Sequence, residues 1–154
     1  MQTRARTILT AGVAVMLLTS GQAIAASDGT ADDAKAMLAR AVAAVIANEP
    51  SALAAFSSGA GGFKQGDLYV FCARRDGTVD AHIDPKQIGR KLQDQYDKVG
   101  VAFGLEMMAV AKEGQLTEVA YMWPRPDTLT PVHKVTFVTR VADQVCGVGF
   151  YQTD

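Results

Sequence analysis

Residues 117–151 have the sequence TEVAYMWPRPDTLTPVHKVTFVTRVADQVCGVGFY. Apolar and other side chains alternate along three parts of this segment, and such alternation is typical of β-strands. The three runs are residues 119–123, 133–141 and 144–151. A stretch with three prolines and a short Ala-Asp joint separate them, so the segment predicts a three-strand antiparallel meander. One face of such a sheet needs an apolar layer to cover it.

The start of the chain resembles a secretory signal peptide. Two arginines, Arg4 and Arg6, precede an apolar run over residues 8–18, and small residues follow up to Ala25. The apolar run is too short to span a bilayer comfortably. We therefore expect residues 1–25 to be cleaved and residues 26–154 to form one exported domain. An uncleaved N-terminal anchor is the alternative interpretation.

Composition limits the classes of function. The 154 residues are 49% hydrophobic, which is enough for one core. Without Arg4 and Arg6 the chain carries 13 basic against 16 acidic residues, a formal charge of about −3, and it has no basic stripe. Nucleic acid and anionic membranes are therefore poor partners. No run beyond the leader is long enough for a transmembrane helix.

The two cysteines lie in different predicted strands, Cys72 in residues 67–73 and Cys146 in the last run. In an oxidising compartment an even number of cysteines favours a disulfide, which we expect here between adjacent strands. Two buried thiols or a metal pair are the alternatives. A metal site is the weaker of these, because the chain has no CxxC motif and its two histidines lie in separate segments.

The rest of the chain predicts two helical regions and a hairpin. Residues 32–49 form an alanine-rich helix capped by Thr30 or Asp32, with an apolar stripe, and Pro50 is expected to end it. The stripe consists of Met37, Leu38, Ala41, Val42, Val45 and Ile46. A further turn over residues 51–56 and a flexible glycine-rich loop over residues 57–62 would follow.

A hairpin signal comes next. Residues 67–73 and 78–83 alternate around an Asp-Gly pair, which is typical of a β-hairpin. After Pro85 the period changes, and residues 88–96 and 101–112 both predict helices. The predicted order is therefore helix, two strands, a helical crossover and three strands.

Together these segments resemble a known family. The motifs that carry the resemblance are GDLYVFCARRDGTVDAHIDPKQIG, DKVGVAFGLEMMAVAKEG, VAYMWPRP, PVHKVTFVTRV and CGVGFY. They resemble a single Cache domain of the type 2 class, an extracytoplasmic small-molecule sensor found in bacterial chemoreceptors and kinases and as free-standing periplasmic proteins. The resemblance implies an α+β fold with a five-stranded antiparallel sheet. A long N-terminal helix would cover one face, and the helical crossover would close a ligand pocket on the other.

Candidate contacts for that ligand come from the meander. Tyr121 and Trp123 alternate with their neighbours, so both rings leave one sheet face, and Tyr69 is expected to join them. Packing in the core is the alternative role for such aromatics, and the preferred one for Phe71. Trp123 is the more open to function, because Pro124 follows it and places it at a strand end.

Three cationic or titratable residues complete the set. Lys134 follows the turn closely, and the resemblance implies a pocket role for it; a cation beside aromatic rings suits a small carboxylate. Arg125 could bind a carboxylate through two nitrogens, although a surface position is its default. His82 precedes a proline, which the resemblance places near the pocket mouth, whereas a structural role is the alternative. Arg140 shares the strand parity of Lys134. For its side chain, exposure to solvent and a role beside the pocket are equal interpretations.

The expected function is a periplasmic module that binds a small organic molecule, with a carboxylate as the favoured chemical class, without cofactor or metal. A membrane receptor or kinase would be its signalling partner. No GxSxG, HExxH, phosphate loop or haem motif is present, so an enzyme is the less favoured class. A ligand-free structural or protein-interaction module is the main alternative.

Overall fold

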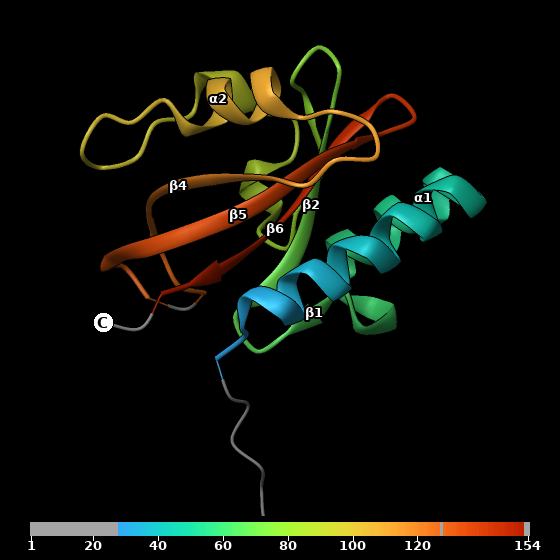
Figure 1. Ribbon diagram of the computed structural model, residues 1–154, viewed down its shortest axis with the longest axis horizontal. Coiled ribbons are helices and arrows are strands. Elements are labelled where there is room, and N and C mark those ends of the chain that lie inside the picture. Colours follow the sequence, from blue (N-terminus) through green and yellow to red (C-terminus); the bar gives the residue numbers. More distant parts are fainter. Residues whose placement is uncertain (1–27, 127, 153–154) are drawn as a thin grey trace, which may run out of the picture.

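The computed structural model describes residues 28–126 and 128–152, so the predicted signal peptide lies outside the described residues. A long helix packs against one face of an antiparallel sheet, and a second helix with its flanking loops covers the other face (Figure 1). The helices are α1 (Ala31–Ser58) and α2 (Phe103–Val110). The strands are β1 (Lys64–Gln65), β2 (Leu68–Arg74), β3 (Val79–Ala81), β4 (Thr117–Pro124), β5 (Pro131–Val141) and β6 (Gln144–Tyr151).

The predicted meander is confirmed as β4, β5 and β6, and the α+β fold class is confirmed with it. The sheet order is β1-β2-β6-β5-β4, and β3 pairs with β2. These five pairings between the described strands are antiparallel. The sheet thus has six strands rather than the predicted five, because the two-residue strand β1 pairs with the start of β2. So short a strand has no alternating pattern in the sequence by which it could be recognised.

Helix α1 begins as predicted at Thr30, whose side chain and that of Asp33 form a reciprocal capping box. The prediction that Pro50 ends this helix is wrong. The backbone leaves the helical region at Asn48, and the Asn48 side chain accepts the backbone N–H of Ser51 at 3.0 Å. Asn48 therefore caps a second helical segment in which Pro50 occupies the first turn, where its missing N–H costs nothing. Helix α1 continues to Ser58, into the stretch predicted to be a loop.

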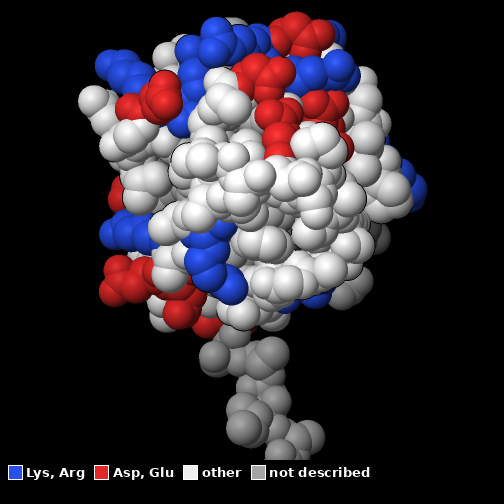
Figure 2. Space-filling view, turned by 90° about the vertical axis from the view of Figure 1, so that its right-hand side faces the viewer, with Lys and Arg blue, Asp and Glu red and all other residues white. Residues whose placement is uncertain are grey.

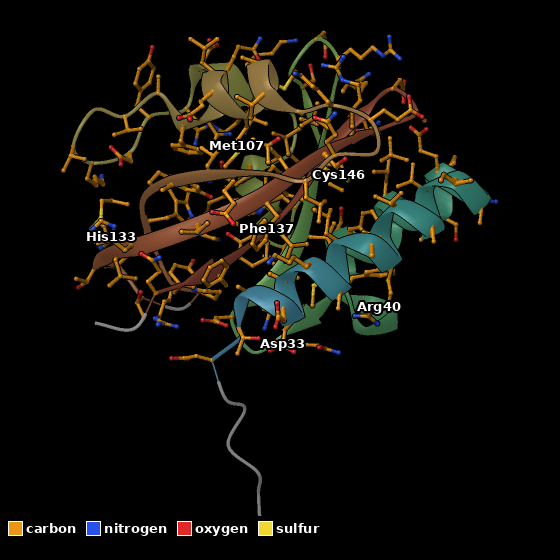
Figure 3. All side chains as sticks on the ribbon, viewed as in Figure 1. Asp33, Arg40, Met107, His133, Phe137 and Cys146 are labelled. Carbon is orange, nitrogen blue, oxygen red and sulfur yellow. A yellow bond between two sulfur atoms is a disulfide. The ribbon has the colours of Figure 1, made fainter. Side chains whose placement is uncertain are left out.

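Two apolar layers hold the sheet between the helices. Phe137 lies between the sheet and α1, whereas Met107 points from α2 to the opposite face (Figure 3). Five of the six predicted stripe residues of α1 are buried or partly buried in the first layer. Ile46 is the exception, because it is 73% exposed.

The crossover between β3 and α2 is the largest departure from the sequence prediction. Residues 88–96 are not a helix; short 3-10 turns lie at Pro85–Gln87 and Leu92–Asp94. The chain between these turns forms backbone hydrogen bonds with the hairpin instead. The N–H of Val79 donates to the carbonyl of Arg90, and the N–H of Gly89 donates to the carbonyl of Val79. Gly89 has a φ of 84°, a left-handed conformation that ends any helix. Hydrogen bonds to the edge of the hairpin therefore determine the backbone conformation of this segment, rather than the helical spacing of its apolar residues.

The Cys72–Cys146 disulfide is confirmed, and it joins directly opposite residues of the neighbouring strands β2 and β6. Both cysteines are fully buried in the layer beneath α1. Within residues 28–126 and 128–152, no helix has both the length and the apolar character needed to span a membrane.

Candidate functional site

The face of the sheet opposite α1 brings together most of the residues that the sequence singled out. In the strand register, Tyr121 of β4 lies opposite Lys134 of β5, and Lys134 lies opposite Tyr151 of β6. Side chains of directly paired residues leave the same face of a sheet. Tyr69 of β2 reaches the same group, because its hydroxyl lies 2.9 Å from the Lys134 ammonium.

Lys134 is buried at the centre of this group and is only 2% exposed. Its ammonium donates to the hydroxyls of Tyr69 and Tyr151, at 2.9 and 3.3 Å, and lies over both rings, at 4.3 and 4.7 Å from their centroids. Gly149 makes room for the lysine stem, since a Cβ there would lie 2.3 Å from its Cε. Two phenol groups thus hold the Lys134 ammonium, and the missing side chain at Gly149 of β6 leaves space for the lysine stem.

No carboxylate among the described residues lies within ion-pair distance of Lys134. Burial lowers the pKa of Lys134, and the more distant Asp67 opposes this shift. Asp67 itself is bonded to Arg125 and to the backbone N–H of Gly29. A buried ammonium without a counter-ion is costly, so the site favours an anion that would approach Lys134.

An open cleft of about 500 Å³ lies next to this cluster. Its walls come from the start of β2, the segment after β3, the end of β4 and the β4–β5 connection. The residues that line it include Tyr69, His82, Asp84, Trp123, Arg125 and Leu129. Four of the six predicted contacts therefore line one cleft. Lys134 lies directly behind Tyr69, and Tyr121 lies deeper in the core.

The space between the sheet and α2, where the resemblance implied a closed pocket, is nearly filled. Only about 20 Å³ remains there, roughly the volume of one water molecule. The ring of Phe103 stacks on that of Tyr121, with centroids 4.1 Å apart and planes 7° from parallel. The Tyr121 hydroxyl bonds to Thr136 at 3.0 Å. The room for a ligand is consequently in the open cleft, beyond Trp123.

Arg125 is not a free surface residue. Its guanidinium forms ion pairs with Asp67 and with Asp28, the latter at 3.1 Å, and lies over the Tyr151 ring at 4.8 Å. The Tyr151 hydroxyl donates to the carbonyl of Pro124 at 2.7 Å. These contacts fix the β4–β5 connection to the segment before α1, to the turn before β2 and to the end of β6, and they hold a cation at the cleft wall.

His82 is neutral at ordinary pH. Burial, and next the positive charge of Lys134, lower the pKa of His82 to about 4. The backbone N–H of Asp84 donates to His82 Nδ1 at 2.9 Å, which leaves the ring proton on Nε2. The ring meets the edge of Tyr69, with centroids 5.1 Å apart. His82 therefore holds the loop, as the structural alternative expected, and its side chain also lines the cleft; a role in ligand binding stays a prediction.

The lowered pKa of His82 predicts a pH dependence of stability. Between about pH 6.5 and pH 4 the unfolded chain binds a proton that the folded chain refuses, so stability falls as the pH falls through this window. His82→Asn should remove about 3 kcal/mol of that fall, while its amide oxygen can still accept the N–H of Asp84. Urea unfolding of both proteins at several pH values measures this, and parallel curves would contradict the assignment.

Tyr151 and Asp67 were not predicted as site residues. Tyr151 could have been found from the sequence, because Gly149 and Tyr151 share a parity in the last run and a glycine leaves space beside an aromatic ring. Asp67 could not, since its partner Arg125 is 58 residues away. Among the described residues no cluster of three or more metal-binding side chains occurs.

Comparison with known proteins identifies the family. A family model for the Cache domain matches residues 51–154, more than half of the chain, and the protein belongs to this family. The sequence-based recognition is thereby confirmed. No match was found among the curated proteins.

Three solved structures have similar folds. A methyl-accepting chemotaxis protein from Vibrio parahaemolyticus is 22% identical, with 78% of this chain and 86% of that chain covered and a TM-score of 0.64. A periplasmic sensor domain of a chemotaxis protein is 23% identical, with 79% and 90% covered and a TM-score of 0.61. A Cache chemosensory domain studied for carboxylic acid recognition is also 23% identical, with 79% and 88% covered and a TM-score of 0.61.

Proposed function

We propose that this protein is an extracytoplasmic sensor module that binds a small carboxylate in the cleft lined by Tyr69, His82, Trp123 and Arg125. Cache domains are sensory ligand-binding modules. One similar structure is a Cache domain that recognises carboxylic acids, and another is a periplasmic sensor domain. The leader-like residues 1–25 support export to the periplasm, with cleavage after Ala25.

The observation that carries the proposal is the buried ammonium of Lys134, which has phenol partners but no carboxylate partner among the described residues. Tyr69 separates it from the cleft. Because its oxygen accepts a hydrogen bond from the Lys134 ammonium, the Tyr69 hydroxyl is free to donate a hydrogen bond to a carboxylate oxygen. Burial raises the pKa of Tyr69, so the phenol keeps that proton at neutral pH. The lysine charge then strengthens the bond from the tyrosine to the anion.

Other cleft groups would complete recognition. Arg125 offers guanidinium nitrogens at the wall, His82 offers its Nε2 proton, and Trp123 offers an apolar face with one N–H donor. Tyr121 would act indirectly, by supporting Phe103 beneath the cleft floor. A membrane receptor or kinase is the expected partner that would read the liganded state. The proposal assigns no cofactor and no catalytic step to this arrangement.

A thermal-shift panel tests the proposal. Short carboxylates should raise the melting temperature by several degrees at saturation, whereas the matched neutral amides, such as acetamide against acetate, should not. Tyr69→Phe removes only the hydroxyl between Lys134 and the cleft and should abolish most of the shift. Tyr96→Phe, at an exposed tyrosine outside the cleft, is the matched control. Equal shifts with acids and amides, or none with either, would favour the ligand-free interaction module instead.

A further inference from the structure

The segment before α1, residues 28–30, packs against the start of β2, whose Tyr69 lines the cleft. The backbone N–H of Gly29 donates to the Asp67 carboxylate at 2.8 Å. Gly29 also lies directly against Leu68, since a Cβ at position 29 would be 2.2 Å from the Leu68 Cγ. The missing side chain allows this close approach, so the segment is fastened to the sheet beside the cleft.

Arg125 is shared between this segment and the cleft. Its Nη1 lies 3.1 Å from the Asp28 carboxylate and also donates to Asp67, while the residue lines the cleft. A guanidinium has five N–H groups, and those on Nε and Nη2 of Arg125 have no acceptor among the described residues. A ligand carboxylate that binds these nitrogens would be the third anion on one cation.

The two internal carboxylates on Arg125 are not held equally. The Asp67 side chain is 9% exposed and also accepts the N–H of Gly29. The Asp28 side chain is 56% exposed, and among the described residues Arg125 is its one partner. Exposed ion pairs contribute little to stability. A further anion at Arg125 would therefore displace Asp28 rather than Asp67.

The acidic surroundings of Asp28 favour the same outcome. Asp32 and Asp33 follow it in the first turn of α1. Acidic side chains gather at the lower left of the face in Figure 2, at the level where α1 begins in Figure 1. Like charges repel one another. Once a ligand shares the charge of Arg125, this repulsion favours movement of Asp28 into solvent.

We propose that Asp28 is an internal competitor of the ligand: a carboxylate bound in the cleft displaces Asp28 from Arg125 and loosens the segment before α1. This regulation rests on the carboxylate site proposed above. The coupling is reciprocal, so the fastened segment lowers the affinity for the carboxylate by the same factor by which the carboxylate loosens the segment. A partner that recognises the start of α1 would thereby distinguish the liganded protein from the free protein.

The affinity of Asp28→Asn for acetate tests the competition. The variant should bind acetate about two- to fivefold more tightly than wild type, which is the factor that an exposed ion pair provides. Asp32→Asn is the matched control. It removes the same charge from a side chain that is 95% exposed near the same end of α1, and it should change the affinity little. NMR titration of each protein with acetate measures the dissociation constants.

A second readout follows the segment itself. The exchange of the Gly29 backbone N–H with water, measured by NMR, should become about two- to fivefold faster when acetate saturates the wild type. Asp28→Asn should show the faster exchange without acetate, because its link to Arg125 is already weakened, and acetate should add little to it. Asp32→Asn should respond to acetate as the wild type does.

The outcomes separate this regulation from the carboxylate site on which it rests. If neither the wild type nor Asp28→Asn binds acetate or any other acid of the thermal-shift panel, the site itself is wrong, and the regulation fails with it. If both proteins bind with equal affinity, or if the Gly29 exchange does not respond to the bound acid, the site stands and the competition by Asp28 is overturned. An equal gain in affinity in Asp32→Asn would reveal a general effect of charge and would overturn it as well.

Discussion

Replacing Lys134 with methionine should make the protein more stable and at the same time unable to bind its carboxylate. Methionine matches the lysine stem in length, but it removes a buried ammonium that has no counter-ion among the described residues. Substituting buried charges by apolar groups of similar volume is often stabilising by about 1 to 4 kcal/mol. The Tyr151 hydroxyl keeps its bond to the Pro124 carbonyl in the variant. Urea unfolding at pH 7 measures the gain.

The gain from Lys134→Met should depend on pH. Burial lowers the pKa of Lys134 from its ordinary value of 10.5, so the folded chain releases its proton before the unfolded chain does. The cost of the charge is therefore full below the folded pKa and disappears as the pH rises toward 10.5. Lys98→Met, at an exposed lysine, is the matched control and should change little. A Lys134→Met protein that is less stable than wild type would contradict the uncompensated-charge account.

Removing the disulfide should have an effect of similar size and opposite sign. The bridge closes a loop of 74 residues, for which the chain-entropy model gives about 4 kcal/mol of stabilisation. The double variant Cys72→Ala/Cys146→Ala should lose roughly this amount, plus a smaller packing contribution, because both sites are fully buried. Chemical unfolding with and without reductant measures it.

The reduced wild type is the control for the double alanine variant. If the crosslink carries the stabilisation, reductant should lower the stability of the wild type toward that of the variant and leave the variant unchanged. A wild-type protein whose unfolding midpoint does not respond to reductant under unfolding conditions would show that the crosslink contributes little.

The sequence predicted the parts of the fold that local patterns determine. Alternation along residues 119–151 was strong enough to define three strands, and the Asp76-Gly77 pair defined the hairpin. The helix over residues 88–96 was wrong, because its apolar spacing competes with backbone bonds to Gly77 and Val79 that no local pattern reveals. The end of α1 was also wrong, since Pro50 is acceptable once Asn48 provides a new cap.

The sequence predicted several of the side chains that gather at the candidate site but not their arrangement, and their role in binding stays a prediction. Strand parity placed Tyr121 and Trp123 on one face, and the register of β4 and β5 puts Lys134, which lies opposite Tyr121, on that same face. Parity could not reveal that Phe103 fills the space above Tyr121, which moves the available room toward Trp123 and Arg125. The Arg125–Asp67 pair was equally hidden, because long-range ion pairs leave no periodic trace in a sequence.

The central claim is that a carboxylate in the cleft interacts with the charge of Lys134. NMR of the lysine side chains with and without acetate, or the best acid from the thermal-shift panel, tests it most directly. The pKa of Lys134 should be lowered in the free protein and should rise when the anion binds, while the side-chain signals of exposed Lys98 should not respond to the anion. A bound carboxylate that leaves the pKa of Lys134 unchanged would contradict the account.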